Sequence, residues 1–326
     1  MSAMTRRSFL AASALAGAAA AFPHPAAAAA PEAKMQGPGA YRYKLGDYQL
    51  TALYDGTWFL PIDDKFVHNA SGAQVNEALA DAFLPPKVLP ISFTALLVNT
   101  GSKLVLIDTG TAGQVTDTAG VMLDNLKIAG VEPSAIDTIV ISHFHPDHID
   151  GIKTKDGAKV FPNAEIKVPE PEWAFWMDDA NMGRYAGNAA VHKYFLNARR
   201  IFSDIAGEVH RFKPGVEVAP GIMSIPAFGH TPGHTAFSVH SGNQSLLAMS
   251  DTVREPWLFV RHPQWQPSYD MDGAMAVTAR TQMLDRAATD RMLVEAYHFP
   301  FPACGHIVKS GSGYDLAPAM WSPLKT

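Results

Sequence analysis

The stretch Ser142-His143-Phe144-His145-Pro146-Asp147-His148-Ile149-Asp150-Gly151 places four side chains that can bind metal ions within six residues. It directly follows the apolar run 136–141, which is short, rich in β-branched residues and almost uninterrupted, as buried strands are. The polar side chains therefore begin where a core strand ends, and α/β sheets bind their ligands at that edge. Such dense packing of histidines predicts a metal site and not an inconsequential loop.

The spacing separates these side chains into two sets. His143 and His145 are two residues apart, so in an extended backbone their side chains point the same way. Pro146 fixes φ and suits the first position of a helix, so Asp147 and His148 are expected to open a new turn that faces elsewhere. We therefore expect an imidazole pair at one metal ion, and a carboxylate with an imidazole at a second.

The composition is that of an ordinary globular enzyme, with 47% hydrophobic and 17% charged residues among 326. Lys and Arg number 26 against 31 Asp and Glu, a net charge of −5, and no basic block indicates nucleic-acid binding. The one cysteine, Cys304, excludes an intrachain disulfide.

Residues 1–30 have the layout of a secretory signal peptide. The pair Arg6-Arg7 precedes an apolar, Ala-rich run and then small residues through Ala30, which indicates the twin-arginine export route. Pro23 and Pro25 cut the apolar run short of the roughly 20 residues that a transmembrane helix needs. We therefore expect one domain over 31–326, no membrane span once the signal is removed, and a periplasmic or secreted protein.

Strand-rich blocks with helices between them occur twice in that domain. Strands are predicted at 41–60, 93–99, 103–107, 136–141, 159–161 and 165–168, and again at 221–226, 236–240, 245–251 and 291–297. Helices are predicted at 75–83, 117–129 and 272–288. This pattern favours an α+β fold, a four-layer αββα sandwich with helices outside two facing sheets and the ligands gathered at one edge.

Two metal ions need more ligands than the loop provides, and other strand ends offer them. His234 follows a Pro-Gly turn, and Asp251 and His298 each end an apolar strand. His230 and His306 compete for the same roles, and the residues alone do not separate His298 from His306.

Two further features bear on the site. Asp108 closes the strand 103–107, where it would serve either as an acceptor for a ligand imidazole or as a turn cap. The segment 170–205 is rich in aromatic residues on expected helices, which would fill the core, form a lid over an apolar pocket, or do both. The residues predicted to bind substrate are Trp173, Phe175, Trp176 and Phe195.

These motifs resemble those of the metallo-β-lactamase superfamily and, within it, of methyl parathion hydrolase and related lactonases. The resemblance rests on residues 99–106, 108–110, the His-x-His-x-Asp-His stretch, 161–164, 229–235 and 298–307. It implies one metal site of His143, His145 and His234, a second of Asp147, His148 and His298, Asp251 as the bridge, and Trp176 in the pocket wall. With the ligands so assigned, we expect Asp108, His230 and His306 to lie behind them as supporting residues. Asp150 and Ser250 depart from the family, since relatives often carry glycine there.

The implied activity is hydrolysis at a dinuclear metal centre. Imidazoles and carboxylates favour a borderline divalent ion, and two zinc ions are expected, although iron, manganese or cobalt would fit. Two ions about 3.5–4 Å apart would hold a bridging hydroxide, with Asp147 and Asp251 as the catalytic carboxylates. The aromatic wall favours a small, neutral, apolar substrate, namely a lactone, an aryl ester or a phosphotriester. A homodimer is compatible with the sequence.

Two other classes of function remain as alternatives. An iron-dependent oxidoreductase of the persulfide dioxygenase type would share the fold but carry a single iron. Flavodiiron proteins usually have Glu where His145 stands, and no flavin-binding segment follows. A non-catalytic binding protein would be expected to lose ligands, whereas all seven expected ligands are present.

Overall fold

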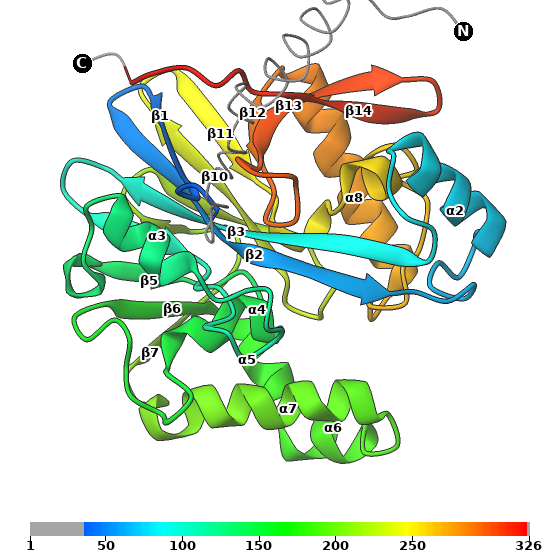
Figure 1. Ribbon diagram of the computed structural model, residues 1–326. Helices are drawn as coiled ribbons and strands as arrows, with labels where there is room; N and C mark the ends of the chain where they lie inside the picture. The colour runs from blue at the N-terminus through cyan, green and yellow to red at the C-terminus, as the bar shows by residue number, and fades with distance from the viewer. Residues whose placement is uncertain (1–35, 325–326) are drawn as a thin grey trace, which may run out of the picture. The chain divides into compact units, whose positions relative to one another are not determined.

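Two seven-stranded mixed sheets form the centre of the protein (Figure 1). The computed structural model describes residues 36–324, so the predicted signal peptide lies outside the described residues. The first sheet follows the chain, with β1 (Ala40–Leu45), β2 (Tyr48–Pro61), β3 (Val88–Asn99), β4 (Leu104–Ile107), β5 (Thr138–Val140), β6 (Glu165–Pro169) and β7 (Val209–Phe212). The second contains β8 (Glu217–Ala219), β9 (Ile222–Pro226), β10 (Thr235–Ser241), β11 (Gln244–Ala248), β12 (Leu293–Glu295), β13 (Cys304–Ser310) and β14 (Gly313–Pro318).

The strand that leads to the metal-binding stretch lies inside the first sheet. All three residues of β5 are buried, and β5 pairs in parallel with β4 on one side and β6 on the other. This confirms the buried strand predicted before Ser142, although the paired part is shorter than 136–141. Because parallel neighbours end at the same edge, the loops after β4 and β5 meet there.

Three apolar layers account for the sandwich. Leu96 and Val105 from the first sheet pack with Phe237 and Leu246 from the second, which forms the layer between the sheets. The outer face of each sheet is covered by helices (Figure 1). The helices are α2 (Gly72–Asp81), α3 (Met122–Ile128), α4 (Pro146–Ile149), α5 (Glu170–Trp176), α6 (Asp179–Arg184), α7 (Ala189–Phe202) and α8 (Gly273–Thr289). The predicted αββα sandwich is confirmed.

Several element predictions need correction. Residues 159–161 form only an isolated bridge between Lys159 and Lys153, and the strands β7, β8, β13 and β14 were not predicted. Helix α3 begins at Met122 instead of 117, because the Asp55 carboxylate accepts hydrogen bonds from the Met122 and Thr111 backbone N–H groups. Those bonds hold the preceding residues in turns.

The aromatic segment 170–205 is helical as predicted, with α5, α6 and α7 in succession. Side chains of α7 pack against α5 and lie close to α4, which carries part of the metal-binding stretch. Within residues 36–324, no helix combines the length and the apolar character needed to cross a membrane.

Candidate metal centre

The loop after β5 has the geometry that its spacing predicts. His145 keeps an extended backbone at φ −68° and ψ 150°, and Pro146 opens the short helix α4 directly after it. The His143 Nε2 and His145 Nδ1 atoms lie 3.0 Å apart, so these two imidazoles do face the same point. Asp147 and His148 belong to α4, and their side chains belong to a second group of candidate ligands.

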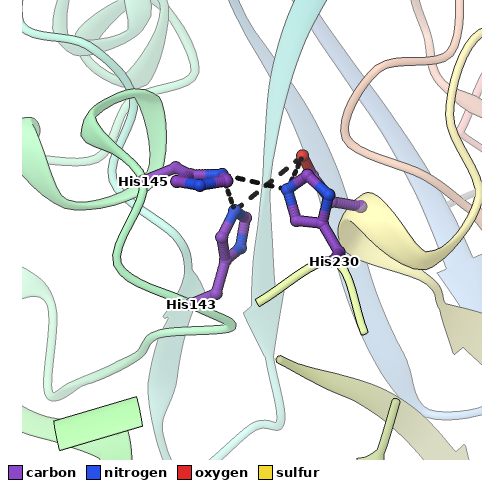
Figure 2. A group of neighbouring side chains, drawn as sticks. His143, His145 and His230 are labelled. Carbon is purple, nitrogen blue, oxygen red and sulfur yellow. Dashed lines mark hydrogen bonds and ion pairs between the residues drawn. The ribbon is translucent and has the colours of Figure 1, made fainter. Parts of the chain in front are cut away.

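The first group of candidate ligands consists of His143, His145, His230 and Asp251, whose ligand atoms all lie within 4.8 Å of one another. Figure 2 shows the three imidazoles converging, two from the loop after β5 and one from the loop before β10. The His230 Nε2 atom is 2.9 Å from His145 Nδ1 and 3.2 Å from Asp251 Oδ2.

The second group consists of Asp147, His148 and His298. Its three residues come from α4 and from the loop after β12, and His298 is completely buried. Asp251 also contacts this group, since its Oδ1 lies 3.2 Å from His148 Nε2 and its Oδ2 lies 3.0 Å from His298 Nε2. Asp251 therefore stands between the two groups, where a bridging carboxylate would stand.

The first group contains His230 and not His234, which the resemblance implied as a ligand, although the His234 ring also lies beside the centre, 4.9 Å from that of His143. The His234 Nε2 atom accepts a hydrogen bond of 3.1 Å from the Asp251 backbone N–H, so its lone pair is already engaged. Burial lowers the pKa of His234 to about 3, which keeps the ring neutral and able to accept. The residue pattern alone does not distinguish these two histidines, which lie four residues apart in one turn, and only the resemblance favoured His234. His230 was expected only to support the ligands.

Outer partners orient the candidate ligands. His148 Nδ1 donates to Asp108 Oδ2 at 2.8 Å, which is the first of the two arrangements that the sequence offered for Asp108. His230 Nδ1 donates to Asp270 Oδ1 at 2.9 Å, and His298 Nδ1 donates to a backbone carbonyl at 2.8 Å. Because carboxylates and carbonyls only accept, each of these rings is held with Nε2 free to bind.

His306 does not belong to this outer layer. It lies on β13 with an exposed side chain, and its Nδ1 bonds the Met292 carbonyl at 2.9 Å. The prediction that His306 supports the ligands is therefore wrong. Strand pairing holds it outside the site, because His306 stands opposite Leu293 in the sheet, whereas His298 lies in the loop at the sheet edge.

The charge and the unpaired atoms of the centre fit divalent cations. Burial would lower the pKa of His148, but neighbouring carboxylates, that of Asp251 foremost, raise it well above its ordinary value. Although they lie 3.2 Å apart, His148 Nε2 and Asp251 Oδ1 are both buried and neither forms a hydrogen bond among residues 36–324. Leaving such atoms unpaired costs roughly 1–3 kcal/mol each. A cation would pair both, and imidazoles with carboxylates form a donor set that suits Zn²⁺.

The four aromatic residues predicted to bind substrate instead belong to the core. Trp176 and Phe195 are fully buried, and their rings pack 4.7 Å apart between α5 and α7. Trp173 is also buried, and Phe175 packs against Trp176 and Phe195. None of the four is among the residues that line the two cavities next to the candidate ligands.

Those two cavities share His145, Tyr194 and Tyr269 as lining residues. The larger has a volume of about 430 Å³, and its remaining lining residues are Tyr185, Asn188, Ala190, Val191, Ser268, Asp270 and Met271. The smaller, of about 60 Å³, is lined in addition by Trp58, Leu60, Ile91, Phe93, Val115, Asp147 and Arg254. Tyrosines and an arginine, which the sequence analysis did not single out, therefore border the centre.

Asp150 and Ser250 stand where relatives often carry glycine, and the backbone differs at the two positions. Asp150 has φ −66°, so its position does not require glycine, and its carboxylate bonds Asn197 and Arg200 of α7. Ser250 has φ +45°, a conformation that disfavours residues other than glycine. Its hydroxyl donates to Ser142 Oγ at 2.8 Å, which ties the loop of Asp251 to the loop after β5.

Comparison with known proteins identifies the family. The family model of the metallo-beta-lactamase superfamily matches residues 91–287, and the chain belongs to that superfamily. The crystal structure of AbOPH, a hydrolase of the beta lactamase superfamily, superposes with a TM-score of 0.83 at 31% identity, covering 89% of this chain and all of that one.

Two lactonases are also similar. AidC, a dizinc quorum-quenching lactonase determined with a product bound, superposes with a TM-score of 0.82 at 27% identity, covering 87% of this chain and 99% of that one. The N-acyl homoserine lactonase AiiA of Bacillus thuringiensis subsp. kurstaki is 24% identical over 212 residues, which are 59% of this chain and 73% of that one. The family and these relatives support a metallo-hydrolase.

The grouping of His230, rather than His234, with the first set of candidate ligands makes a prediction about these two histidines. We expect His230→Ala to lose one metal ion per chain and most hydrolytic activity, because it removes a side chain of the first group. His234→Ala is the matched control. It should keep both ions and lose less activity than His230→Ala. The loss should be at most roughly 10–100-fold, which is what removing an outer partner of a metal ligand costs. Elemental analysis of the purified variants measures the difference, and selective metal loss in His234→Ala would support the ligand set that the resemblance implies.

Proposed function

We propose that this protein is a hydrolase with two zinc ions that cleaves neutral esters, with lactones and aryl esters as its main substrates and phosphotriesters as further ones. The observation that carries the proposal is the pair of ligand groups joined by Asp251, in which buried nitrogen and oxygen atoms lack partners within the described residues. The likeness to a dizinc lactonase over nearly the whole described chain supports the same chemistry.

When bound, two divalent ions would lower the pKa of a water molecule and polarise the electrophile. The protein's own residues hold the rest of the arrangement. Asp108 fixes the tautomer of His148, and Asp270 does so for His230. The Tyr297 hydroxyl donates to the backbone carbonyl of Asp147 at 2.6 Å and so holds this residue in place. The Asp147 carboxylate lies 3.3 Å from His148 Nε2. Asp147 is therefore placed to accept a proton or to orient the attacking water.

The walls of the site favour an uncharged substrate with some apolar surface. The smaller cavity is lined mainly by Trp58, Leu60, Ile91, Phe93 and Val115, and the larger by tyrosines with Val191 and Met271. Burying apolar surface contributes about 25 cal/mol per Å². This wall differs in its residues from the predicted one, but it supports the same class of substrate.

A substrate panel tests the proposal. Zinc-loaded protein should hydrolyse lactones and aryl esters, and the chelated protein should not. Phosphate monoesters and β-lactams should be turned over poorly. Efficient turnover of those two classes without any activity on neutral esters would contradict the proposal, and a single iron with no zinc would favour the oxidoreductase alternative.

Removal of the metal ions should also destabilise the fold. An ion that binds only the native state stabilises it by about 2.7 kcal/mol at a free concentration of 100 Kd. We therefore expect chelation to lower the melting temperature in differential scanning calorimetry, and added zinc to restore it. An unchanged melting temperature after verified metal removal would show that the centre contributes nothing to stability.

A further inference from the structure

Arg254 is a buried cation at the edge of the centre that the reaction as described so far does not use. Its side chain is 7% exposed, and its Nη1 donates to Asp251 Oδ2 at 2.7 Å. The face of the guanidinium stacks on Tyr269, with the central carbon 4.0 Å from the ring centre. These contacts fix its position three residues after the carboxylate that joins the two ligand groups.

The guanidinium has more donors than these contacts satisfy. An arginine side chain carries five N–H groups. Besides the bond to Asp251, the structure gives only a long contact of 3.4 Å from Nη2 to Glu255, and Nε is buried without a partner among residues 36–324. Asp251 Oδ2 is shared with the imidazoles of His230 and His298, so the carboxylate cannot compensate Arg254 alone.

Arg254 also borders a cavity next to the candidate ligands. Arg254 lines the cavity of about 60 Å³ together with Asp147 and His145, one residue from each ligand group. The other walls of this cavity are mostly apolar. A buried cation in such surroundings is stabilised when an oxygen carrying negative charge pairs with it.

We propose that Arg254 binds the substrate oxygen that gains negative charge when the ester is attacked. The inference rests on the proposed function. In the reaction, the oxygen of water bonds to the acyl carbon and the carbonyl π electrons move to the carbonyl oxygen. They return as the bond to the leaving oxygen breaks. One proton of the water passes to the leaving oxygen and the other to solvent, which leaves a carboxylate. The same guanidinium would then hold that carboxylate until release.

The test compares zinc-loaded Arg254→Met, Arg254→Lys and wild type on an aryl ester and a lactone. We expect Arg254→Met to lower kcat by about 10²–10³-fold with a smaller change in KM, since preorganised oxyanion donors act mainly on the transition state. Arg254→Lys keeps the charge and should recover part of the loss. Arg261→Met is the matched control and should behave as wild type. Arg261 is a half-exposed arginine whose ion pair within residues 36–324 is with Asp315.

Calorimetric titration with hexanoate, a model of the product carboxylate, measures anion affinity. The substitution would not change this affinity if Arg254 had a purely structural role. Arg254→Met should bind hexanoate at least about tenfold more weakly at unchanged zinc content. Wild-type kcat and hexanoate binding in Arg254→Met would overturn the inference. So would full recovery of kcat by excess zinc, because Arg254 would then only hold Asp251. If wild type hydrolyses no ester, the proposed function fails, and equal hexanoate binding by wild type and Arg254→Met overturns the anion site independently.

Discussion

His298→Ala is expected to lower kcat/KM for an ester substrate by more than the roughly 10–100-fold that the loss of an outer partner causes. The reason is its place in the second ligand group, where Nε2 faces Asp251 at 3.0 Å and Asp147 at 3.6 Å. The Nδ1 bond to the Ser92 carbonyl holds that orientation, and no other described histidine is grouped with Asp147 and His148. Steady-state kinetics and elemental analysis should show both the activity and one metal ion lost.

His306→Ala is the matched control, since His306 lies only eight positions further along the chain. Its side chain is exposed on β13 and contacts no member of either ligand group in the structure. This variant should retain both ions and nearly wild-type kinetics. A larger loss of activity in His306→Ala than in His298→Ala would mean that the second group has been assigned wrongly.

Glu172→Ala is expected to have the largest effect on stability. Glu172 is fully buried on α5, and its carboxylate accepts four hydrogen bonds. Oε1 accepts from the Phe144 N–H at 3.0 Å and from Trp176 Nε1 at 2.7 Å. Oε2 accepts from the Gly233 N–H at 2.7 Å and from the Thr231 hydroxyl at 3.0 Å. One side chain thus joins the loop of His143 and His145 to the loop of His230.

Removing that carboxylate leaves buried donors on both loops unpaired, each at a cost of roughly 1–3 kcal/mol. We expect the free energy of unfolding, measured in urea, to fall by about 3–5 kcal/mol, because breaking a buried hydrogen-bond network has effects of this size. Glu170→Ala, an exposed glutamate on the same helix, should change it by less than about 0.5 kcal/mol. If the two variants proved equally stable, the carboxylate would not be what connects the loops.

The parts of the site that follow from local geometry could be predicted from the sequence. His143 and His145 fall into one group and Asp147 and His148 into the other, because a strand end followed by Pro146 fixes the directions of four nearby side chains. The same reasoning could not choose between His230 and His234. That choice depends on Asp270, which lies 40 residues beyond His230 in the chain and holds its ring.

Aromatic residues on helices show a similar limit. Tyr194 and Phe195 are neighbours on α7, yet Tyr194 borders both cavities whereas Phe195 is fully buried against Trp176. Composition identifies the segment as aromatic, but the packing of α7 on α5 decides which face reaches the site. Arg254 was missed for a related reason, since a single arginine in a loop carries no signal until its neighbours are known.

Titration of metal-free protein with Zn²⁺, followed by lactone hydrolysis and metal content at each step, tests the central proposal most directly. Two ligand groups that share Asp251 predict that activity rises until two zinc ions per chain are bound and then stays constant. Full activity at one ion per chain, or two bound zinc ions without hydrolysis of any ester or lactone, would contradict the account.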